Sequence, residues 1–171
     1  MPNFVHERQK PLSPLERPRE LIVACAPMRS NVNLSRIVRT AGCCGVRQVI
    51  CCGQAKMIDK IARDSIDDEN PAAVEIRVHR TLAPPLKELK SEGYRLVGLE
   101  QATGSVSLYD FRFDRRSVLV LGNERQGLDD GILRLLDAVV EIPVYGLPYA
   151  YNVATAAAMA LYEYCRQFPR G

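Results

Sequence analysis

Two glycines, Gly122 and Gly127, bracket the polar residues Asn-Glu-Arg-Gln directly after the hydrophobic run SVLVL. Because glycine has no side chain, such a loop lets backbone amides approach a ligand closely. The loop is not a Walker A phosphate-binding loop, since Leu128 and Asp129 stand where Lys and Ser or Thr are required. It also lacks the G-x-G-x-x-G spacing of dinucleotide-binding loops. The segment predicts either a ligand-binding loop or a plain turn between a strand and a helix.

A second candidate segment is PVYGLPYAYN at residues 143–152, which leads into an alanine-rich stretch at residues 153–160. Asn152 is a preferred residue type for the N-cap of a helix. The small residues that follow allow another backbone or a flat ligand to come close. The pattern therefore fits a capped helix packed on a sheet and also a ligand site, and the two can coexist.

The third candidate segment carries polar residues at helical spacing: Asn33, Arg36 and Thr40 are three or four residues apart, and Arg39 lies three beyond Arg36. Residues at these spacings are neighbours on a helix surface, so we expect all four in one broad polar stripe. Two arginines near the carboxyl end of a strand could hold phosphates. The alternative is the solvated face of an ordinary amphipathic helix.

The elements that position these segments alternate along the chain. Short apolar runs predict strands, and longer stretches between them predict helices. This alternation is typical of an α/β domain with a largely parallel sheet and helices on both faces, in which ligands bind outside the carboxyl ends of the strands. We expect strands at 21–26, 48–53, 74–79, 95–100, 117–122 and 139–144, and helices at 33–44, 56–66, 86–92, 131–136 and 152–167.

The three segments, taken in this order, resemble the motifs of the TrmH (SpoU) family of SPOUT-superfamily RNA 2′-O-ribose methyltransferases. The first motif corresponds to Asn33 followed by Arg-Thr-Ala at residues 39–41 and Gly-Val at residues 45–46. The second corresponds to LVLGNERQGL at residues 119–128. The third corresponds to IPVYG, Asn-Val and Leu-Tyr-Glu within residues 142–163, so the resemblance runs from about residue 21 to residue 166.

The resemblance implies a fold whose C-terminal segment threads a deep trefoil knot, a topology that general rules would not predict. It also implies S-adenosylmethionine as cofactor and a homodimer in which two chains complete each active site. By position, the cofactor-contacting residues are Gly122, Ile142, Tyr151 and Asn152. The catalytic residue is Arg39, supported by Asn33, Glu124 and Asn152, and RNA is bound by Arg36 and Arg39.

The predicted reaction is transfer of a methyl group from S-adenosylmethionine to a ribose 2′-hydroxyl of tRNA or rRNA. A guanidinium stays protonated in proteins, so we expect Arg39 to act as a cation that lowers the pKa of the hydroxyl and holds a phosphate. We expect Glu124 to orient Arg39 through a charge-assisted pair.

The sequence departs from the family pattern at three positions. Ala150 and Ala154 stand where the third motif usually has serines, and Ser35 stands where the first usually has glycine. Any role of the two hydroxyls must be filled in another way or lost. The alternative function is therefore a catalytically inactive RNA-binding or ribosome-assembly protein with the same fold.

Composition fits an RNA partner. The chain has 171 residues, of which 47% are hydrophobic and 25% charged, as expected for one globular domain. Of its 23 basic residues, 18 are Arg, whose donor fork matches phosphate better than Lys does. Seven basic and three acidic residues lie between positions 1 and 39, although an ordinary arginine-rich surface would give the same count.

No apolar run approaches the ~20 residues of a membrane helix, and the first residues are too polar for a secretory signal. We expect a soluble cytoplasmic protein.

Residues 1–20 contain four prolines among charges and no apolar periodicity, so they are predicted to form an arm before a methyltransferase domain at residues 21–171.

Six cysteines remain to be explained. Adjacent cysteines on a strand point to opposite faces, which disfavours a shared metal ion. We interpret them as small apolar core residues, with metal binding as the alternative. They are Cys25, Cys43, Cys44, Cys51, Cys52 and Cys165.

Overall fold

The described residues form one sheet of seven strands in the order β3-β2-β1-β6-β4-β7-β5, and every pair of neighbours is parallel. The computed structural model describes residues 11–53 and 74–171. The central strands β1 and β6 are buried along their whole length, as their aliphatic sequences require. The strands are β1 (Leu21–Cys25), β2 (Gln48–Cys52), β3 (Glu75–His79), β4 (Arg95–Leu99), β5 (Val106–Ser107), β6 (Ser117–Leu121) and β7 (Ala138–Glu141).

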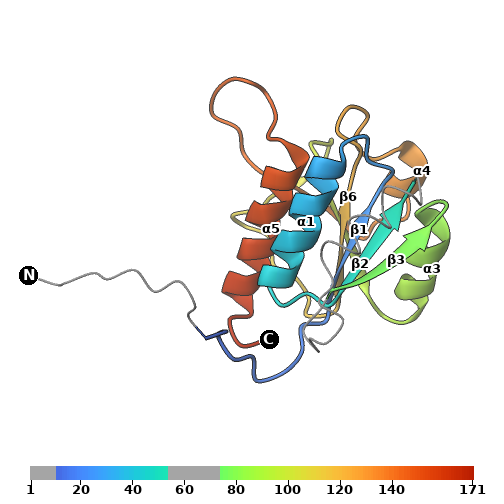
Figure 1. The fold of residues 1–171 in the computed structure, drawn as a ribbon. Helices are drawn as coiled ribbons and strands as arrows, with labels where there is room; N and C mark the ends of the chain where they lie inside the picture. The colour runs from blue at the N-terminus through green and yellow to red at the C-terminus, as the bar shows by residue number, and fades with distance from the viewer. Residues whose placement is uncertain (1–10, 54–73) are drawn as a thin grey trace, which may run out of the picture.

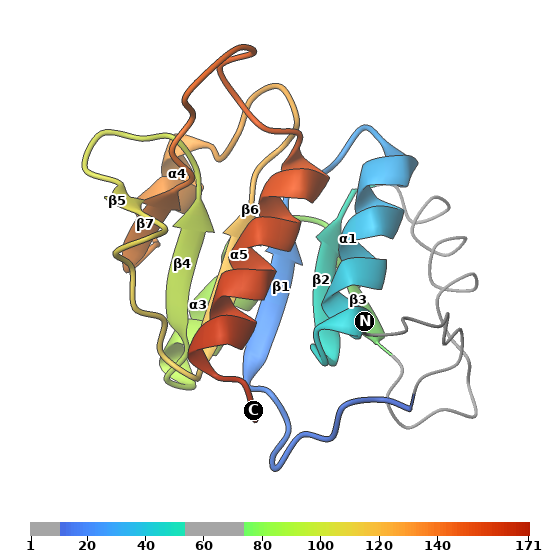
Figure 2. The ribbon, with the colours of Figure 1, turned by 90° about the vertical axis from the view of Figure 1, so that its left-hand side faces the viewer.

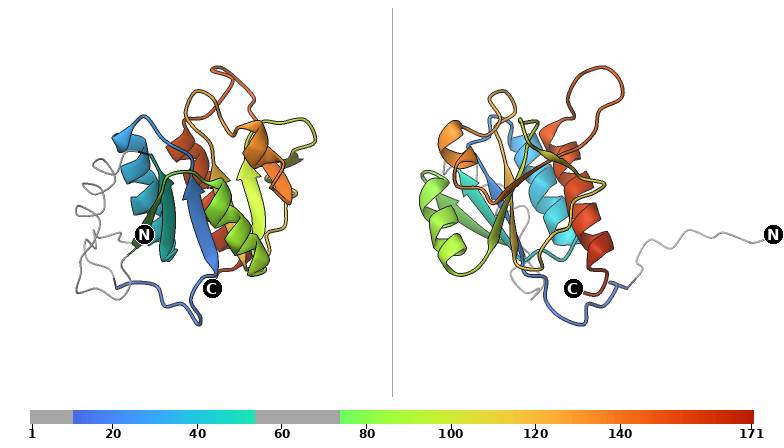
Figure 3. Two further views of the ribbon diagram at one scale, coloured as in Figure 1. Left: turned by 90° about the vertical axis from the view of Figure 1, so that its right-hand side faces the viewer. Right: turned by 180° about the vertical axis from the view of Figure 1, so that it is seen from behind.

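Helices cover both faces of this sheet. Helices α1 (Asn31–Cys43) and α5 (Val153–Gln167) lie side by side on one face, as Figures 1 and 2 show. Helices α3 (Ala83–Ser91) and α4 (Asp130–Leu133) lie on the other, which is seen in Figure 3. The predicted α/β architecture with a parallel sheet is therefore confirmed. No helix of the described ranges is both long and apolar enough to cross a membrane.

The core is divided by the sheet into two clusters, and strand β6 contributes to both. Leu119 and Leu121 pack in the cluster under α1 and α5, whereas Val118 and Val120 pack in the cluster under α3 and α4. This division follows from the alternation of side chains along a strand. A continuous apolar run such as SVLVL is what a strand covered on both faces needs.

The predicted elements differ from the observed ones mainly at their ends. Helix α1 begins at Asn31, two residues before the predicted start at residue 33, because the hydroxyl of Ser30 caps it by accepting from the backbone N–H of Asn33. Helix α3 begins at Ala83 because prolines are tolerated in a first helical turn. The two-residue strand β5 was not predicted, since two residues carry no periodicity. The helix expected at residues 56–66 lies outside the described residues.

The register of the sheet brings the candidate segments to one edge. Cys25 in β1 and Leu99 in β4 are both level with Leu121 in β6, and Val140 in β7 is level with Leu99. The loops that follow these four strands therefore start at the same height. Because all the strands are parallel, this edge is the carboxyl edge where α/β proteins bind ligands.

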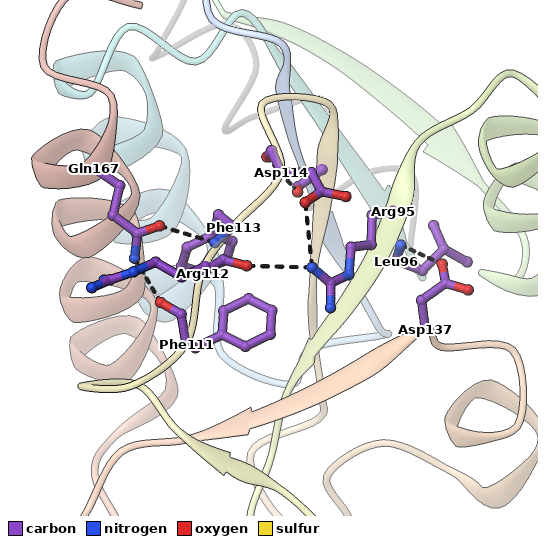
Figure 4. A network of polar contacts seen from close by, with 9 residues as sticks. Arg95, Leu96, Phe111, Arg112, Phe113, Asp114, Asp137 and Gln167 are labelled. Atoms are coloured by element: carbon purple, nitrogen blue, oxygen red, sulfur yellow. Dashed lines mark hydrogen bonds and ion pairs between the residues drawn. The ribbon is translucent and has the colours of Figure 1, made fainter.

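At the opposite edge, a polar network fixes the C-terminal end of α5 (Figure 4). The side-chain amide of Gln167 accepts from the backbone N–H of Phe113 and donates to the carbonyl of Phe111, at 2.9 and 2.8 Å. Arg95 in β4 contacts the same connection through the carboxylate of Asp114, at 3.4 Å. The segment that leads from β5 into β6 is thus held between α5 and β4 (Figure 4).

Residues 11–20 form neither helix nor strand, but they pack against the end of the chain. The backbone N–H of Glu16 donates to the carbonyl of Arg170, and the side chains of these two residues form an exposed ion pair. Arg19 lies over the ring of Tyr164 and donates to the carbonyl of Phe168. This part of the predicted arm therefore contacts the domain.

The cysteines divide into core and helix-end residues. Cys25, Cys51 and Cys52 are buried, and Cys51 and Cys52 belong to the clusters on opposite faces of the sheet, as predicted. The prediction that all six cysteines are core residues is wrong for Cys43, which is exposed. Cys44 and Cys165 fit it only in part, because they are half-buried. The reason is their place at the C-terminal ends of α1 and α5, where the helices leave the core.

A cysteine titration tests the packing of these two helix ends. The thiol of Cys165 donates to the carbonyl of Cys44 at 3.8 Å, and side-chain hydrogen bonding with Cys44, opposed by burial and aided by the charge of Arg19, lowers the pKa of Cys165 to about 7. A group with a lowered pKa ionises at lower pH, so we expect one thiolate to appear near pH 7. Ultraviolet absorbance of the thiolate in a pH titration would show it, and Cys165→Ser should remove that step. A wild-type titration identical to that of Cys165→Ser would contradict the contact.

Candidate active site

The carboxylate of Glu124 joins the loop after β6 to the loop after β1. Its Oε1 accepts from the backbone N–H of Ser30 at 3.0 Å and from the side-chain amide of Asn33 at 3.2 Å. Its Oε2 accepts from the backbone N–H of Arg29 at 3.0 Å. Three donors converge on one carboxylate, so Glu124 fixes the approach to α1 relative to the glycine-bracketed loop.

Asn33 extends this contact to the third segment. Its side chain is buried, and its Oδ1 accepts from Nδ2 of Asn152 at 3.2 Å. Oδ1 of Asn152 in turn caps α5 by accepting from the backbone N–H of Ala154 at 2.9 Å and of Thr155 at 3.4 Å. Glu124, Asn33 and Asn152 therefore form a continuous hydrogen-bonded chain. The structure brings together three of the predicted site residues, and their catalytic roles stay predictions.

The hydrogen bonds decide the charge of Glu124. Burial by itself raises the pKa of this carboxyl, but backbone N–H groups, those of Arg29 and Ser30 among them, and the amide of Asn33 more than offset it. The net effect holds the pKa of Glu124 below its usual 4.5. The group is thus an ionised acceptor that holds loops in place, and it is not poised as a general acid.

Glu124→Gln is expected to destabilise the protein by about 2 kcal/mol at neutral pH, because the new amide turns a donor towards a backbone N–H that needs an acceptor. A lowered pKa in the folded state gives stability that is present above the unfolded-state pKa and is lost as pH falls through the folded-state value. The difference in free energy of unfolding between wild type and variant should therefore shrink below pH 4.5. Urea titrations across this range measure it. Glu88→Gln, at an exposed carboxylate of α3, is the control, and an equal effect of the two substitutions would contradict the role of Glu124.

The backbone of the loop after β6 passes so close to Gly122 that a larger residue would not fit there. A Cβ on Gly122 would lie 2.4 Å from the carbonyl carbon of Gly127 and 2.7 Å from the nitrogen of Leu128. The loop is closed by paired backbone hydrogen bonds between Asn123 and Gly127 at 3.0 and 2.9 Å, and Gly127 has a φ of +65°. Asn123 also donates to the carbonyl of Pro27 at 2.6 Å. The two glycines thus allow a tight turn whose backbone packs on itself.

A cavity of about 260 Å³ opens beside this turn, at the carboxyl ends of β4, β6 and β7. Three predicted cofactor residues, Gly122, Ile142 and Tyr151, line it, and Asn152 lies next to Tyr151 in the chain. The wall of this cavity has an apolar part and a charged part. The apolar part consists of Leu99, Leu121, Ile142, Val153 and Ala156, and the charged part of Glu100, Glu124, Arg125 and Glu141.

Sequence reasoning missed Glu100 and Gln101, which hold two of the loops around this cavity. Glu100 accepts from the backbone N–H of Leu128 at 2.9 Å, and Gln101 donates to the carbonyl of Tyr149 at 3.2 Å. Both residues directly follow β4, whose end is level with that of β6. Their position at the carboxyl end of the strand predicted at 95–100 was the available signal, because polar residues there reach the same edge.

Comparison with known proteins shows the family of the chain. The chain matches the SpoU rRNA Methylase family over residues 20–162. The chain belongs to this family. It is 26% identical over 148 residues to the Escherichia coli tRNA (guanosine(18)-2′-O)-methyltransferase, a match that covers 86% of the chain and 64% of that protein. The chain therefore spans slightly less than two thirds of this relative.

Solved structures of the SpoU family share the fold. The TrmH/SpoU tRNA modifying enzyme of A. aeolicus superposes with a TM-score of 0.75 at 26% identity, over 91% of this chain and 78% of that one. The SpoU methyltransferase AviRb from Streptomyces viridochromogenes, solved in complex with the cofactor AdoMet, gives a TM-score of 0.73 at 26% identity. That match covers 92% of this chain and 61% of AviRb.

The two arginines of α1 that were predicted to bind RNA, Arg36 and Arg39, lie apart from this cavity in their own chain. Asn33 belongs to the buried face of α1, whereas Arg36 and Arg39 are exposed, so the expectation of one polar stripe holding all four residues is wrong. The reason is helical geometry: six residues turn the helix by about 240° and advance it by about 9 Å. Within the described residues, neither arginine lines the cavity and no ion pair joins Arg39 to Glu124. The expected orientation of Arg39 by Glu124 is therefore not found within this chain, because Glu124 is occupied by other donors.

Proposed function

We propose that this SpoU-family chain transfers a methyl group from S-adenosylmethionine to a ribose 2′-hydroxyl of tRNA or rRNA. One observation carries the proposal: two of the three motif segments, far apart in the sequence, line one cavity, and the hydrogen-bonded chain Glu124–Asn33–Asn152 ties the third to them. The family description names rRNA methylation and the E. coli relative is named for tRNA, so both RNA classes are candidates.

The residues of the cavity suit S-adenosylmethionine. A flat adenine ring fits the apolar wall that includes Leu121 and Ile142, and carboxylates at Glu100 and Glu141 can accept hydrogen bonds from ribose hydroxyls. The carboxylates also complement the positive charge of a sulfonium. We assign Gly122, Ile142 and Tyr151 to cofactor binding. When bound, the cofactor supplies an already activated methyl group, so the residues around it need only bind and orient.

In this proposal the protein positions and activates the nucleophile. A fixed positive charge beside the 2′-hydroxyl stabilises its developing oxyanion, and Arg39 is the residue we assign to that task. The proton passes to water or to a phosphate oxygen, because a guanidinium cannot take it. Glu124, Asn33 and Asn152 act as positioning residues that hold the loops around the cavity, and Arg36 is assigned to an RNA phosphate.

We further propose a homodimer in which Arg39 of one chain serves the cavity of the other. Arg39 is exposed and does not line the cavity of its own chain, and α5, which packs against α1, leaves Met159 and Tyr162 exposed. Apolar side chains on an exposed helix face are typical of a contact surface. Light scattering at micromolar concentration should give twice the 19.1 kDa mass of the chain, and a monomer would contradict a shared site.

The remaining parts of the proposal concern topology, location and the arm. We infer that the segment from β7 to α5 is threaded as the family's trefoil knot, since it lines a cavity together with the ends of β4 and β6 and the helix that follows it packs against α1. We place the protein in the cytoplasm, together with its cofactor and RNA. We assign residues 1–20 to an arm that helps to hold RNA, in keeping with the basic residues near that end.

The test of function is direct. The protein is mixed with labelled S-adenosylmethionine and total RNA from a methyltransferase-deficient strain, and the labelled nucleotide is mapped. We expect label on a 2′-oxygen of one tRNA or rRNA position. Absence of heat in a calorimetric titration with both the cofactor and its demethylated product would overturn the proposal.

A further inference from the structure

The segment between β7 and α5 exposes several large side chains. Tyr145, Leu147 and Tyr149 are 83%, 77% and 80% exposed, and Tyr151 is 42% exposed. Figure 1 shows this segment, in orange-red, standing clear of the sheet beyond the N-terminal end of α5. Such a cluster of exposed apolar side chains usually marks a contact with another molecule.

The loop is fixed at its base while its rings stay free. The carbonyl of Tyr149 accepts from Gln101, and Asn152 is bound both to Asn33 and to the first turn of α5. A tyrosine ring carried on a fixed backbone has only two side-chain torsions to order when it binds. Aromatic contact area is therefore presented here at a low cost in conformational entropy.

The charges nearby favour an anionic and aromatic partner. From Ile142 to Tyr162 the sequence contains no charged residue, so no carboxylate of this segment repels a phosphate. Arg125 is exposed and lines the same cavity as Ala150 and Tyr151. Aromatic rings beside arginines are the arrangement by which proteins bind unpaired bases and their backbone.

The carboxylates of the cavity do not oppose this partner. Glu124 accepts from three donors, Glu100 accepts from backbone N–H groups, and Glu141 accepts from the hydroxyl of Ser105 at 2.8 Å. These three carboxylates line the cavity, whereas Tyr145 and Tyr149 do not. A neutral ribose at the cavity and its base outside it on the tyrosines would match this distribution.

We propose that Tyr145 and Tyr149 form a stacking platform for an unpaired base of the RNA, next to the ribose presented to the cavity. This inference rests on the proposed function, because it takes the bound RNA to be the methyl acceptor. It selects single-stranded or looped RNA as the substrate, since a base inside a duplex has no free face to stack. A second copy of the chain is the competing occupant of the same side chains.

The binding test uses a fluorescein-labelled single-stranded RNA of mixed sequence and the same strand annealed to its complement. Because a stacked base contributes about five- to 150-fold to affinity, the double variant Tyr145→Leu/Tyr149→Leu should lose at least tenfold in affinity for the single strand. The double Phe variant should retain affinity, because it keeps both rings. Tyr109→Leu, at another exposed tyrosine, is the control, and affinity for the duplex should not change.

Three outcomes would overturn the platform: no loss with the Leu variant, an equal loss for single strand and duplex, or a Leu variant that becomes monomeric by light scattering when wild type is dimeric. Calorimetric titration of S-adenosylmethionine separates this inference from the proposed function. If the Leu variant still binds the cofactor and its RNA affinity is unchanged, the stacking platform is refuted and the proposed function stands. If RNA binding depends on the two rings but the wild-type protein neither binds the cofactor nor methylates RNA, the proposed function is refuted and the stacking platform stands.

Discussion

Arg39→Ala should lower the single-turnover rate of methyl transfer by on the order of 10²–10³-fold, the loss expected when one preorganised charge beside an oxyanion is removed. Affinity for S-adenosylmethionine should hardly change, because Arg39 does not line the cavity. Rates with saturating RNA, measured beside cofactor binding, check both statements. Arg134→Ala, at an exposed arginine of the opposite face, is the control. Arg36→Ala should instead weaken RNA binding and flatten its dependence on salt.

Mixing variants shows whether Arg39 acts across the dimer. If each site combines the cavity of one chain with Arg39 of the other, a dimer of Arg39→Ala with a cavity-defective Gly122→Ala chain regains one intact site. At a cofactor concentration too low to saturate the Gly122→Ala chain, random exchange of subunits should then restore about a quarter of the wild-type activity from two proteins that are each nearly inactive. A site contained within one chain would show no recovery. An unchanged rate in Arg39→Ala alone would reject the mechanism and leave the family assignment intact.

Gly122→Ala should weaken binding of S-adenosylmethionine by on the order of 10- to 100-fold, because overpacking costs about 1–3 kcal/mol and each 1.4 kcal/mol is tenfold. The new Cβ would lie 2.4 Å from backbone carbon of Gly127, and backbone cannot move aside as a flexible side chain can. The turn must open, and the cavity wall that it forms must shift. Calorimetry measures the affinity, and circular dichroism confirms that the variant is folded.

Gly104→Ala is the matched control for this substitution. Gly104 has a φ of +81° but no atom within 4 Å of the added Cβ, so alanine there strains the backbone without a steric conflict. It should lower the melting temperature and leave cofactor affinity as in wild type. Equal losses of affinity in the two variants would show that the effect of Gly122→Ala is a general loss of stability.

Much of the fold was predictable because the signals for it are local. The run SVLVL has the length and the aliphatic character of a strand buried on both faces, and it is one. The alternation of such runs with helices predicts a parallel sheet, and the structure has one. The two-residue strand β5 was missed, and the end of β7 was misplaced by three residues, because short or proline-adjacent strands are decided by pairing with neighbours rather than by periodicity.

Within the site, residue types were predictable and partners were not. Asn152 as the cap of α5 follows from a local preference, and the structure confirms it. Spacing on a helix suggested that Asn33 and Arg39 share a face, yet Asn33 is buried against the site and Arg39 is exposed. Which side of a helix faces the core depends on the elements packed against it, and a pattern with polar residues on both sides leaves that undecided.

The sequence by itself singled out the segments of the candidate site: the glycine-bracketed loop, the loop before α5 and the start of α1 all carry residue types that favour turns, caps and close backbone approach. Only the tertiary structure decided which atoms meet. Glu124 bonds to Asn33 and to two backbone N–H groups across more than 90 residues of chain, and Gln101 reaches the loop of Tyr149. Such contacts depend on the order and register of the strands. That order is fixed by long-range packing, which no local pattern of residues encodes.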